Sequence, residues 1–229
     1  MKSKDVNKVV LSLGGRPMIL YAIKLLESLK ISPIIAVVGF AKKSVIDVLK
    51  DRVVYVEQKK RLGTAHAVAQ GLKKLDGNVE DVLVVNGDDS AFYKKETLEN
   101  LIKTHLQKDS SITFLTIDIS NLSGMARVIR DANNKVIAVV EDKDSSEEQK
   151  KIKEVNSGCY VFDLDFLHKY LKTIEKSKKT REYYLTRLID IAVKKNQRVI
   201  AVKGGPILWR GINTMEELRE AERMFLQAR

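Results

Sequence analysis

Three polar stretches of this 229-residue chain each follow an apolar run, and their residue types could bind a nucleotide or a metal ion. In open α/β sheets, ligands bind where strands end at their carboxyl edge. In the first stretch, residues 57–66, Gln58 offers an amide donor and an acceptor, and Gly63 lets a ligand approach the backbone closely. A nucleotide base could be bound there. A solvated basic loop that leads into a helix explains the same residues and is the more common case.

The second and third stretches carry oxygen ligands. Asp88 follows an apolar run and a glycine in residues 86–89, a position suited to holding Mg²⁺ against phosphates. A tight turn at Gly87-Asp88 accounts for the same sequence equally well. Asn213 precedes the last expected helix, a position where asparagine is more often a turn residue or a helix cap than a metal ligand.

The sulfur and imidazole side chains do not suggest a separate site. Cys159 is the only cysteine, so it has no partner for an internal disulfide. Cys159, His66, His105 and His168 lie far apart in the sequence, and their spacing fits no common metal-binding pattern. Cys159 is expected in the core rather than as a nucleophile. A reducing cytoplasm is the expected location.

The composition favours an anionic small-molecule partner. The formal net charge is +11, from 41 Lys and Arg against 30 Asp and Glu, which favours anions. The basic residues lie on expected helix faces without interleaved aromatics, so nucleic acid is not an expected partner. The longest run without a charged or polar side chain, residues 33–41, is far shorter than the roughly 20 residues of a membrane-spanning helix. No membrane association is expected.

Alternating apolar runs and helical periodicity predict an α/β fold, with a mostly parallel sheet, helices on both faces and a small β-ribbon. A single domain over residues 1–229 is expected. The strands of the sheet are predicted at 33–40, 53–56, 82–85, 155–162 and 199–202, the first three buried on both faces, and the ribbon at 127–130 and 136–140. Helices are predicted from Pro17, around Val68–Leu75 and Leu98–His105, and from Asp165 and Glu182. A surface helix or loop is predicted at 145–154, and a capping box at Thr214 and Glu217 opens the last helix.

The order and spacing of several short motifs indicate a family resemblance. The chain resembles the nucleotidyltransferase half of N-acetylglucosamine-1-phosphate uridylyltransferases over nearly its whole length. The motifs are Lys8-Val9-Val10-Leu11, Gly15-Arg16-Pro17-Met18, Gln58 with Leu62-Gly63-Thr64-Ala65-His66-Ala67, Gly87-Asp88, Val140-Glu141-Asp142-Lys143-Asp144, Glu154-Val155-Asn156-Ser157-Gly158, Glu182-Tyr183-Tyr184-Leu185-Thr186 and Gly211-Ile212-Asn213.

The resemblance implies a reaction and a set of site residues. UTP and N-acetylglucosamine 1-phosphate would give UDP-N-acetylglucosamine and pyrophosphate, with Mg²⁺ as cofactor and no protein nucleophile. Lys8 would contact phosphate and, with Asp88, serve catalysis. The other implied roles are uracil binding by Gln58, Gly63 and Thr64, Mg²⁺ binding by Asp88 and Asn213, and sugar binding by Ala126, Glu141, Asn156 and Thr186. No acetyltransferase activity is expected, because no hexapeptide repeat is present.

Departures from the family pattern qualify this expectation. The glycine-rich triphosphate loop of the form L-A-A-G-x-G-T-R-M has no counterpart, and Met1 aligns with its last residue. A central strand would then be missing, although Val9–Leu13 could instead supply strand and loop. Other departures are Asn7 for a proline, Ala126 for a glycine, Arg187 for an aspartate and Arg210 for an acidic residue. Weak or absent activity, another base or sugar, and a catalytically silent binding domain remain alternatives.

Overall fold

The computed structural model describes residues 5–77, 79–88, 90–118, 124–205, 212 and 214–227. The chain divides into two compact units. The first comprises Met1–Lys60, Val85–Leu98 and Ile207–Arg229, and the second comprises Arg61–Val84 and Glu99–Pro206. Among the described helices, none combines the length and the apolar character that crossing a membrane requires.

The first unit opens with short elements rather than with a strand of a larger sheet. Residues Lys8–Val10 form a 3-10 helix, η1, and the side chain of Asn7 caps it by accepting a 3.2 Å hydrogen bond from the Val9 backbone N–H. Strands β1 (Ser12–Leu13) and β2 (Arg16–Pro17) then form a tight antiparallel hairpin. In the described chain, residues 9–13 therefore pair with no long strand, and the alternative of a central strand there is wrong.

A helical and strand layer follows in the same unit. Helix α1 (Ile19–Ser28) buries Ala22, Ile23 and Leu26, as its periodicity predicts, but it begins two residues after Pro17, which belongs to β2. Strands β3 (Ile35–Val38) and β4 (Val54–Glu57) pair in parallel, and α2 (Lys42–Leu49) connects them. These strands are half-buried rather than buried on both faces, since each has one strand neighbour among the described residues.

The last helix completes the first unit. Helix α8 (Met215–Gln227) opens with the predicted capping box, in which the Glu217 N–H donates to Thr214 Oγ1 at 3.1 Å and the Thr214 N–H donates to Glu217 Oε2 at 2.9 Å. Phe225 and other buried residues of α8 cluster with Leu13, Met18 and Ile212. A Cβ at Gly14 would lie 2.6 Å from the Phe225 ring, so this contact needs glycine. The short 3-10 helix η3 (Ser90–Phe92) also lies in this unit.

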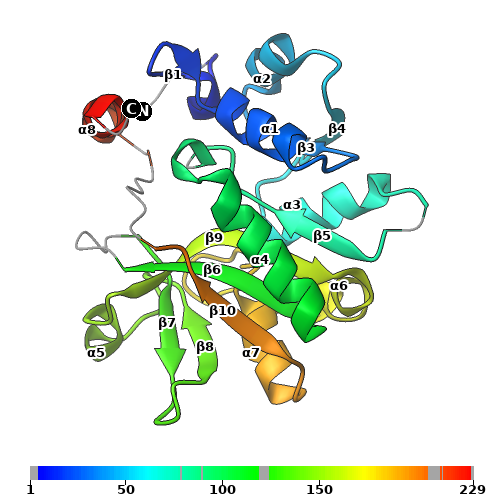
Figure 1. The fold of residues 1–229 in the computed structure, drawn as a ribbon, viewed down its shortest axis with the longest axis vertical. Helices are drawn as coiled ribbons and strands as arrows, with labels where there is room; N and C mark the ends of the chain where they lie inside the picture. The colour runs from blue at the N-terminus through cyan, green and yellow to red at the C-terminus, as the bar shows by residue number, and fades with distance from the viewer. Residues whose placement is uncertain are drawn as a thin grey trace. The chain divides into compact units, whose positions relative to one another are not determined.

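The second unit is built on a mixed sheet (Figure 1). Its strands follow the order β10 (Val199–Lys203), β6 (Ile112–Asp118), β9 (Glu154–Asp163), β7 (Arg127–Arg130) and β8 (Val136–Val140), and β5 (Asp81–Val84) also pairs with β9. Only β10 and β6 pair in parallel in this sheet; β9 runs antiparallel to β5, β6 and β7. The expectation of a mostly parallel sheet is therefore wrong, because apolar runs do not encode strand direction.

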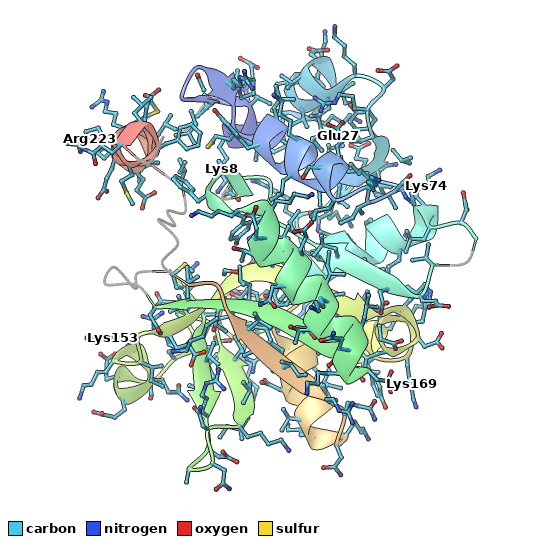
Figure 2. All side chains as sticks on the ribbon, viewed as in Figure 1. Lys8, Glu27, Lys74, Lys153, Lys169 and Arg223 are labelled. Atoms are coloured by element: carbon cyan, nitrogen blue, oxygen red, sulfur yellow. The ribbon has the colours of Figure 1, made fainter. Side chains whose placement is uncertain are left out.

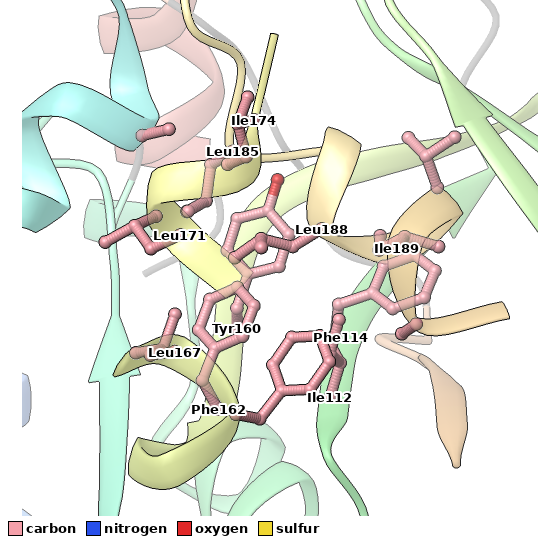
Figure 3. Packing of buried hydrophobic residues seen from close by; sticks show 14 of the residues in the cluster. Ile112, Phe114, Tyr160, Phe162, Leu167, Leu171, Ile174, Leu185, Leu188 and Ile189 are labelled. Atoms are coloured by element: carbon pink, nitrogen blue, oxygen red, sulfur yellow. The ribbon is translucent and has the colours of Figure 1, made fainter. Parts of the chain in front are cut away.

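Helices cover this sheet and bury its apolar residues. Those whose apolar side chains pack in its core are α3 (Thr64–Gly71), η2 (Leu72–Lys74), α6 (Leu164–Tyr170), η4 (Leu171–Thr173) and α7 (Arg187–Lys194). Helix α5 (Glu147–Lys150) buries no residue, and α4 (Lys95–Lys108) has residues in both units. Tyr160 and Phe162 of β9 stack with ring centroids 5.3 Å apart, and Leu167 and Leu188 pack in the same cluster (Figure 3). Exposed lysines such as Lys74 and Lys169 extend outward from these helices (Figure 2). The second unit is therefore an α/β layer structure.

Helix α7 begins at Arg187, five residues later than predicted. The backbone of Tyr183 is bonded elsewhere: its N–H donates to Leu62 O at 2.7 Å, and its carbonyl accepts from the Ala65 N–H at 3.0 Å. The Leu185 N–H donates to Thr64 Oγ1 at 2.9 Å. Because these groups pair with Leu62 and with the first two residues of α3, they are not available for a helical ladder.

Candidate active site

Three of the predicted sugar-binding residues occupy neighbouring positions in the second unit: Ala126 directly precedes β7, Glu141 directly follows β8, and Asn156 lies in β9. Arg127 of β7 pairs with Val140 of β8 on one side and with Val155 of β9 on the other. Since both pairings are antiparallel, Ala126 lies beside the positions of Glu141 and Asn156. The 2.9 Å hydrogen bond from the Asn156 N–H to Ala126 O confirms one of these pairings. Register therefore gathers residues that are far apart in the sequence.

The fourth predicted sugar-binding residue joins this cluster from α7. Thr186 is buried, and its Oγ1 donates a 2.8 Å hydrogen bond to Glu141 Oε1. Helix α7 packs against β8, which ends at the residue before Glu141. Ala126, Glu141, Asn156 and Thr186 thus lie in one region of the second unit.

The cluster has the chemistry of a hydroxyl-binding site. Burial raises the pKa of Glu141, and the neighbouring carboxylates of Asp144 and Glu182 add to this, while Thr186 and Arg187 oppose it. Asn156 is buried, and hydrogen bonds to both its amide nitrogen and its amide oxygen fix the orientation of its side chain. Its Nδ2 donates to the Tyr160 hydroxyl at 2.5 Å, and its Oδ1 accepts from the Gly158 N–H at 3.2 Å. A carboxylate and an oriented amide are suitable partners for sugar hydroxyl and acetamido groups.

Gly63 and Thr64, the N-cap and first residue of α3, are tied to the segment before α7. Gly63 has a φ of 103°, and a Cβ there would lie 2.4 Å from Tyr183 O, so only glycine fits. Thr64 Oγ1 accepts from the Leu185 N–H, 121 residues along the chain. The predicted uracil-binding loop and the predicted sugar-binding segment are therefore joined by backbone contacts within the second unit.

Two ion pairs that the sequence did not reveal support the cluster. Arg127 is buried, and its Nη1 contacts both Asp142 Oδ1, at 2.9 Å, and the Met125 carbonyl. Arg130 forms a two-pronged pair with Glu154, with both N···O distances 2.7 Å. The sequence signal for these pairs is that two arginines lie on one ribbon strand and that acidic residues lie on the neighbouring elements. The pairs can be predicted from it only once the register of the strands is known.

Lys8 and Asp88, the predicted phosphate-binding and catalytic residues, form an ion pair in the first unit. Lys8 Nζ lies 2.5 Å from Asp88 Oδ2, with the Asp88 side chain mostly buried. Gln58 follows β4, and its N–H donates to Val38 O at 2.7 Å, which extends the β3–β4 ladder. Two predicted residues separated by 80 positions are thus placed together, and Gln58 lies at a carboxyl strand end as predicted.

The fit to Mg²⁺ rests on Asp88. Mg²⁺ binds oxygen ligands and usually keeps several waters, with one or two carboxylates and substrate phosphates completing its shell. Asp88 is a carboxylate already held beside a cation, so its chemistry fits such a site. Asn213 lies outside the described residues. The described part of the chain holds no cluster of three or more His, Cys, Asp or Glu side chains suited to a metal.

Comparison with known proteins places the chain. A family model described as nucleotidyl transferase matches residues 3–228. The chain belongs to the nucleotidyl transferase family. It is 38% identical over 226 residues to the bifunctional protein GlmU of Thermoanaerobacter pseudethanolicus, covering 98% of this chain and 48% of that protein. The GlmU protein of Caldicellulosiruptor saccharolyticus is also 38% identical, over 97% of this chain and 48% of its own length.

Solved structures of nucleotidyl transferases share the fold. An apo UDP-glucose pyrophosphorylase aligns with a TM-score of 0.79 at 18% identity, over 98% of this chain and 92% of that one. The inositol-1-phosphate CTP transferase of T. maritima aligns with a TM-score of 0.73 at 17% identity, over 97% and 89%. The chain spans about half the length of the curated relatives that it matches. The predicted α/β class of this family is confirmed.

Proposed function

We propose that this nucleotidyl transferase forms UDP-N-acetylglucosamine and pyrophosphate from UTP and N-acetylglucosamine 1-phosphate. The observation that carries the proposal is the convergence of Ala126, Glu141 and Asn156 in and beside adjacent strands, with Thr186 bonded to Glu141. The similarity to proteins named GlmU over nearly the whole chain supports the same substrates. We propose the reducing cytoplasm as the site of action, because a single cysteine cannot form an internal disulfide.

The proposed reaction needs positioning and charge neutralisation rather than a protein nucleophile. A phosphate oxygen of N-acetylglucosamine 1-phosphate attacks the α-phosphorus of UTP, and the bond from that phosphorus to the bridging oxygen breaks to release pyrophosphate. Glu141, Asn156 and Thr186 would orient the sugar, which makes the attack effectively intramolecular. Gln58, Gly63 and Thr64 would hold the uracil.

In this proposal, residues of the first unit bind the phosphates and Mg²⁺. Lys8 would contact phosphate oxygens, and its pairing with Asp88 keeps its ammonium group directed. Asp88 and Asn213 would hold Mg²⁺, which when bound would neutralise negative charge on the phosphates.

The test is pyrophosphate release by the purified chain from a panel of nucleoside triphosphates and sugar 1-phosphates, with and without Mg²⁺. We expect release with UTP and N-acetylglucosamine 1-phosphate. Asp88→Asn should abolish the Mg²⁺-dependent rate. Calorimetric binding of UDP-N-acetylglucosamine supplies a second measurement that is independent of turnover.

Each other result contradicts the proposal in a defined way. Faster turnover of another pair would show a different base or sugar specificity, for which Ala126 and Arg187 are the departures to examine. Product binding without pyrophosphate release would show a catalytically silent binding domain. If the chain neither binds UDP-N-acetylglucosamine nor releases pyrophosphate, the sugar-nucleotide role is excluded altogether.

A further inference from the structure

The turn that carries Glu141 is held at several points by the segment leading into α7. The Ser177 hydroxyl donates to Asp144 Oδ1 at 3.2 Å, and Arg187 Nη2 donates to Asp144 Oδ2 at 3.0 Å. Lys179 Nζ donates to the Lys143 carbonyl at 2.5 Å. With the Thr186–Glu141 bond, the turn is fastened at both ends, so the position of Glu141 depends on this segment.

Arg187 is the residue of this segment with the widest reach. Besides Asp144, its Nη1 contacts Asp190 Oδ2 at 3.2 Å. Asp190 Oδ1 in turn accepts a 3.3 Å hydrogen bond from the Val139 N–H, at the end of β8. One guanidinium therefore connects the turn after β8, the first turn of α7 and the last residues of β8.

Burial makes these contacts important. The Asp144 and Asp190 side chains are 13% and 19% exposed. Burial raises the pKa of Asp190, and the hydrogen bond from Arg187 acts against this. Arg187 also offsets the effect of Asp144 and Glu182 on Glu141. Without the guanidinium, three carboxylates in this region would lose a neighbouring cation, and the turn would relax away from α7.

We propose that Arg187 is a positioning residue for the sugar-phosphate substrate: it clamps the turn of residues 141–144 onto α7, so that Glu141 and Thr186 stay in register. Arg187 acts through Asp144 and Asp190 and needs no contact with substrate. The inference rests on the proposed function, because that function assigns Glu141 and Thr186 to the sugar. It adds a residue that fixes how well the sugar half binds.

The test uses Arg187→Ala, Arg187→Lys and Asp144→Asn in the full chain. Asp144→Asn keeps an acceptor for Ser177 but removes the charge that pairs with Arg187. Arg52→Ala is the matched control, because Arg52 is 33% exposed, Arg187 is 35% exposed, and each pairs with a carboxylate. Thermal unfolding checks that each variant folds. The readouts are the Kd for UDP-N-acetylglucosamine, the KM and kcat for the sugar phosphate, and backbone hydrogen exchange without ligand.

We expect Arg187→Ala to weaken binding and raise KM by about tenfold, with kcat changed much less, as the loss of a charge-assisted clamp implies. Exchange of the Asp144 and Ser145 amides, which donate to Glu141 O, should quicken. Arg187→Lys should restore part of both effects, Asp144→Asn should reproduce them, and Arg52→Ala should change neither.

Wild-type affinity and wild-type exchange in Arg187→Ala would overturn the clamp. So would an equal fall in affinity in Arg52→Ala, since the effect would then be general destabilisation. A wild-type chain that fails to bind the sugar nucleotide removes the proposed function and this inference with it. If the wild type binds without turnover, the reaction fails but Kd and exchange still decide the role of Arg187.

Discussion

The Thr186 hydroxyl and the Glu141 carboxylate, 45 residues apart, share a 2.8 Å hydrogen bond beside the end of β8. This bond joins a helix start to a strand end, and it leaves a partly buried carboxylate with a hydroxyl as its nearest donor. Burial raises the pKa of Glu141 and outweighs the lowering effect of the Thr186 hydrogen bond, and the nearby carboxylates of Asp144 and Glu182 raise the pKa further. Glu141 is therefore kept in place at a cost to stability whenever it is ionised.

Glu141→Gln is expected to stabilise the fold at neutral pH while impairing sugar binding. A folded-state pKa above the unfolded value favours folding below the unfolded pKa, and that contribution is lost as pH rises through the folded pKa. Glutamine carries no charge and can still accept from Thr186. Thermal unfolding should show an increase in Tm on the order of 2 °C at neutral pH, which shrinks as pH falls toward the usual glutamate pKa.

The control for this variant is Glu148→Gln, because Glu148 is 82% exposed and pairs only across one helical turn with Lys151. It should leave Tm nearly unchanged at every pH. A lower Tm for Glu141→Gln than for wild type at neutral pH would contradict the argument, since it would mean that the ionised carboxylate stabilises the fold.

Gly63→Ala is expected to destabilise the second unit severely. The new Cβ would meet the Tyr183 backbone at 2.4 Å, and the φ of 103° is a conformation that alanine rarely adopts. Backbone cannot move aside as a flexible side chain can, so strain and clash add to about 3 kcal/mol or more. Chemical denaturation measures the loss, and nucleotide binding should fall with it.

Gly77→Ala is the control that distinguishes backbone strain from the steric clash with Tyr183. Gly77 also has a positive φ, 78°, but a Cβ there meets nothing within 4 Å. The loss of stability in Gly77→Ala should be limited to the roughly 1–2 kcal/mol that alanine costs in a left-handed conformation. Equal losses in the two variants would show that the contact between Gly63 and Tyr183 carries no weight.

Local chemistry in the sequence predicted much of the fold. The predicted capping box at Thr214–Glu217 forms, because a cap needs only residues three apart. A second capping box, at Ser146–Gln149, forms within the stretch predicted as a surface helix or loop. The ribbon of β7 and β8 lies where its Asn- and Asp-rich turn predicts. Such signals are short-range, so one sequence is sufficient to read them.

Features that depend on distant pairing could not be read in this way. Strand β9 runs antiparallel to β5, β6 and β7, but an apolar run looks the same in either direction. The start of α7 moved to Arg187 because Tyr183 pairs with Leu62, 121 residues upstream. The supporting pair of Arg127 and Asp142 likewise depends on register. The candidate sugar residues came from a resemblance, and their proximity required the sheet.

Arg130→Ala should destabilise the chain in a pH-dependent way. Burial raises the pKa of Glu154, but several opposing contributions, led by the hydrogen bond from Arg130, together hold the net pKa below its usual value. A depressed pKa gives stability above the unfolded pKa that is lost as pH falls through the folded pKa. The variant should lose about 2 kcal/mol at neutral pH, and the difference from wild type should shrink below the usual glutamate pKa.

Denaturant unfolding at neutral and acidic pH measures this difference, and Arg130→Lys should recover part of it. Lysine keeps the charge but loses the two-pronged geometry that Arg130 presents to Glu154. A loss that stays the same at both pH values would assign the effect to packing of the arginine stem instead of to the ion pair.

Lys8→Ala should strengthen Mg²⁺ binding while slowing turnover. Lys8 Nζ lies 2.5 Å from Asp88 Oδ2, so a cation that binds this carboxylate competes with the ammonium group. Because the Lys8 side chain is 37% exposed, the competition is screened, and its removal should lower the Kd for Mg²⁺ by about two- to fivefold. The maximal rate should fall, since a phosphate contact is lost. Lys42→Ala, which breaks the Lys42–Glu57 pair in the same unit, is the control and should alter neither quantity. Weaker Mg²⁺ binding in Lys8→Ala would show that Lys8 and Mg²⁺ do not compete for the Asp88 carboxylate.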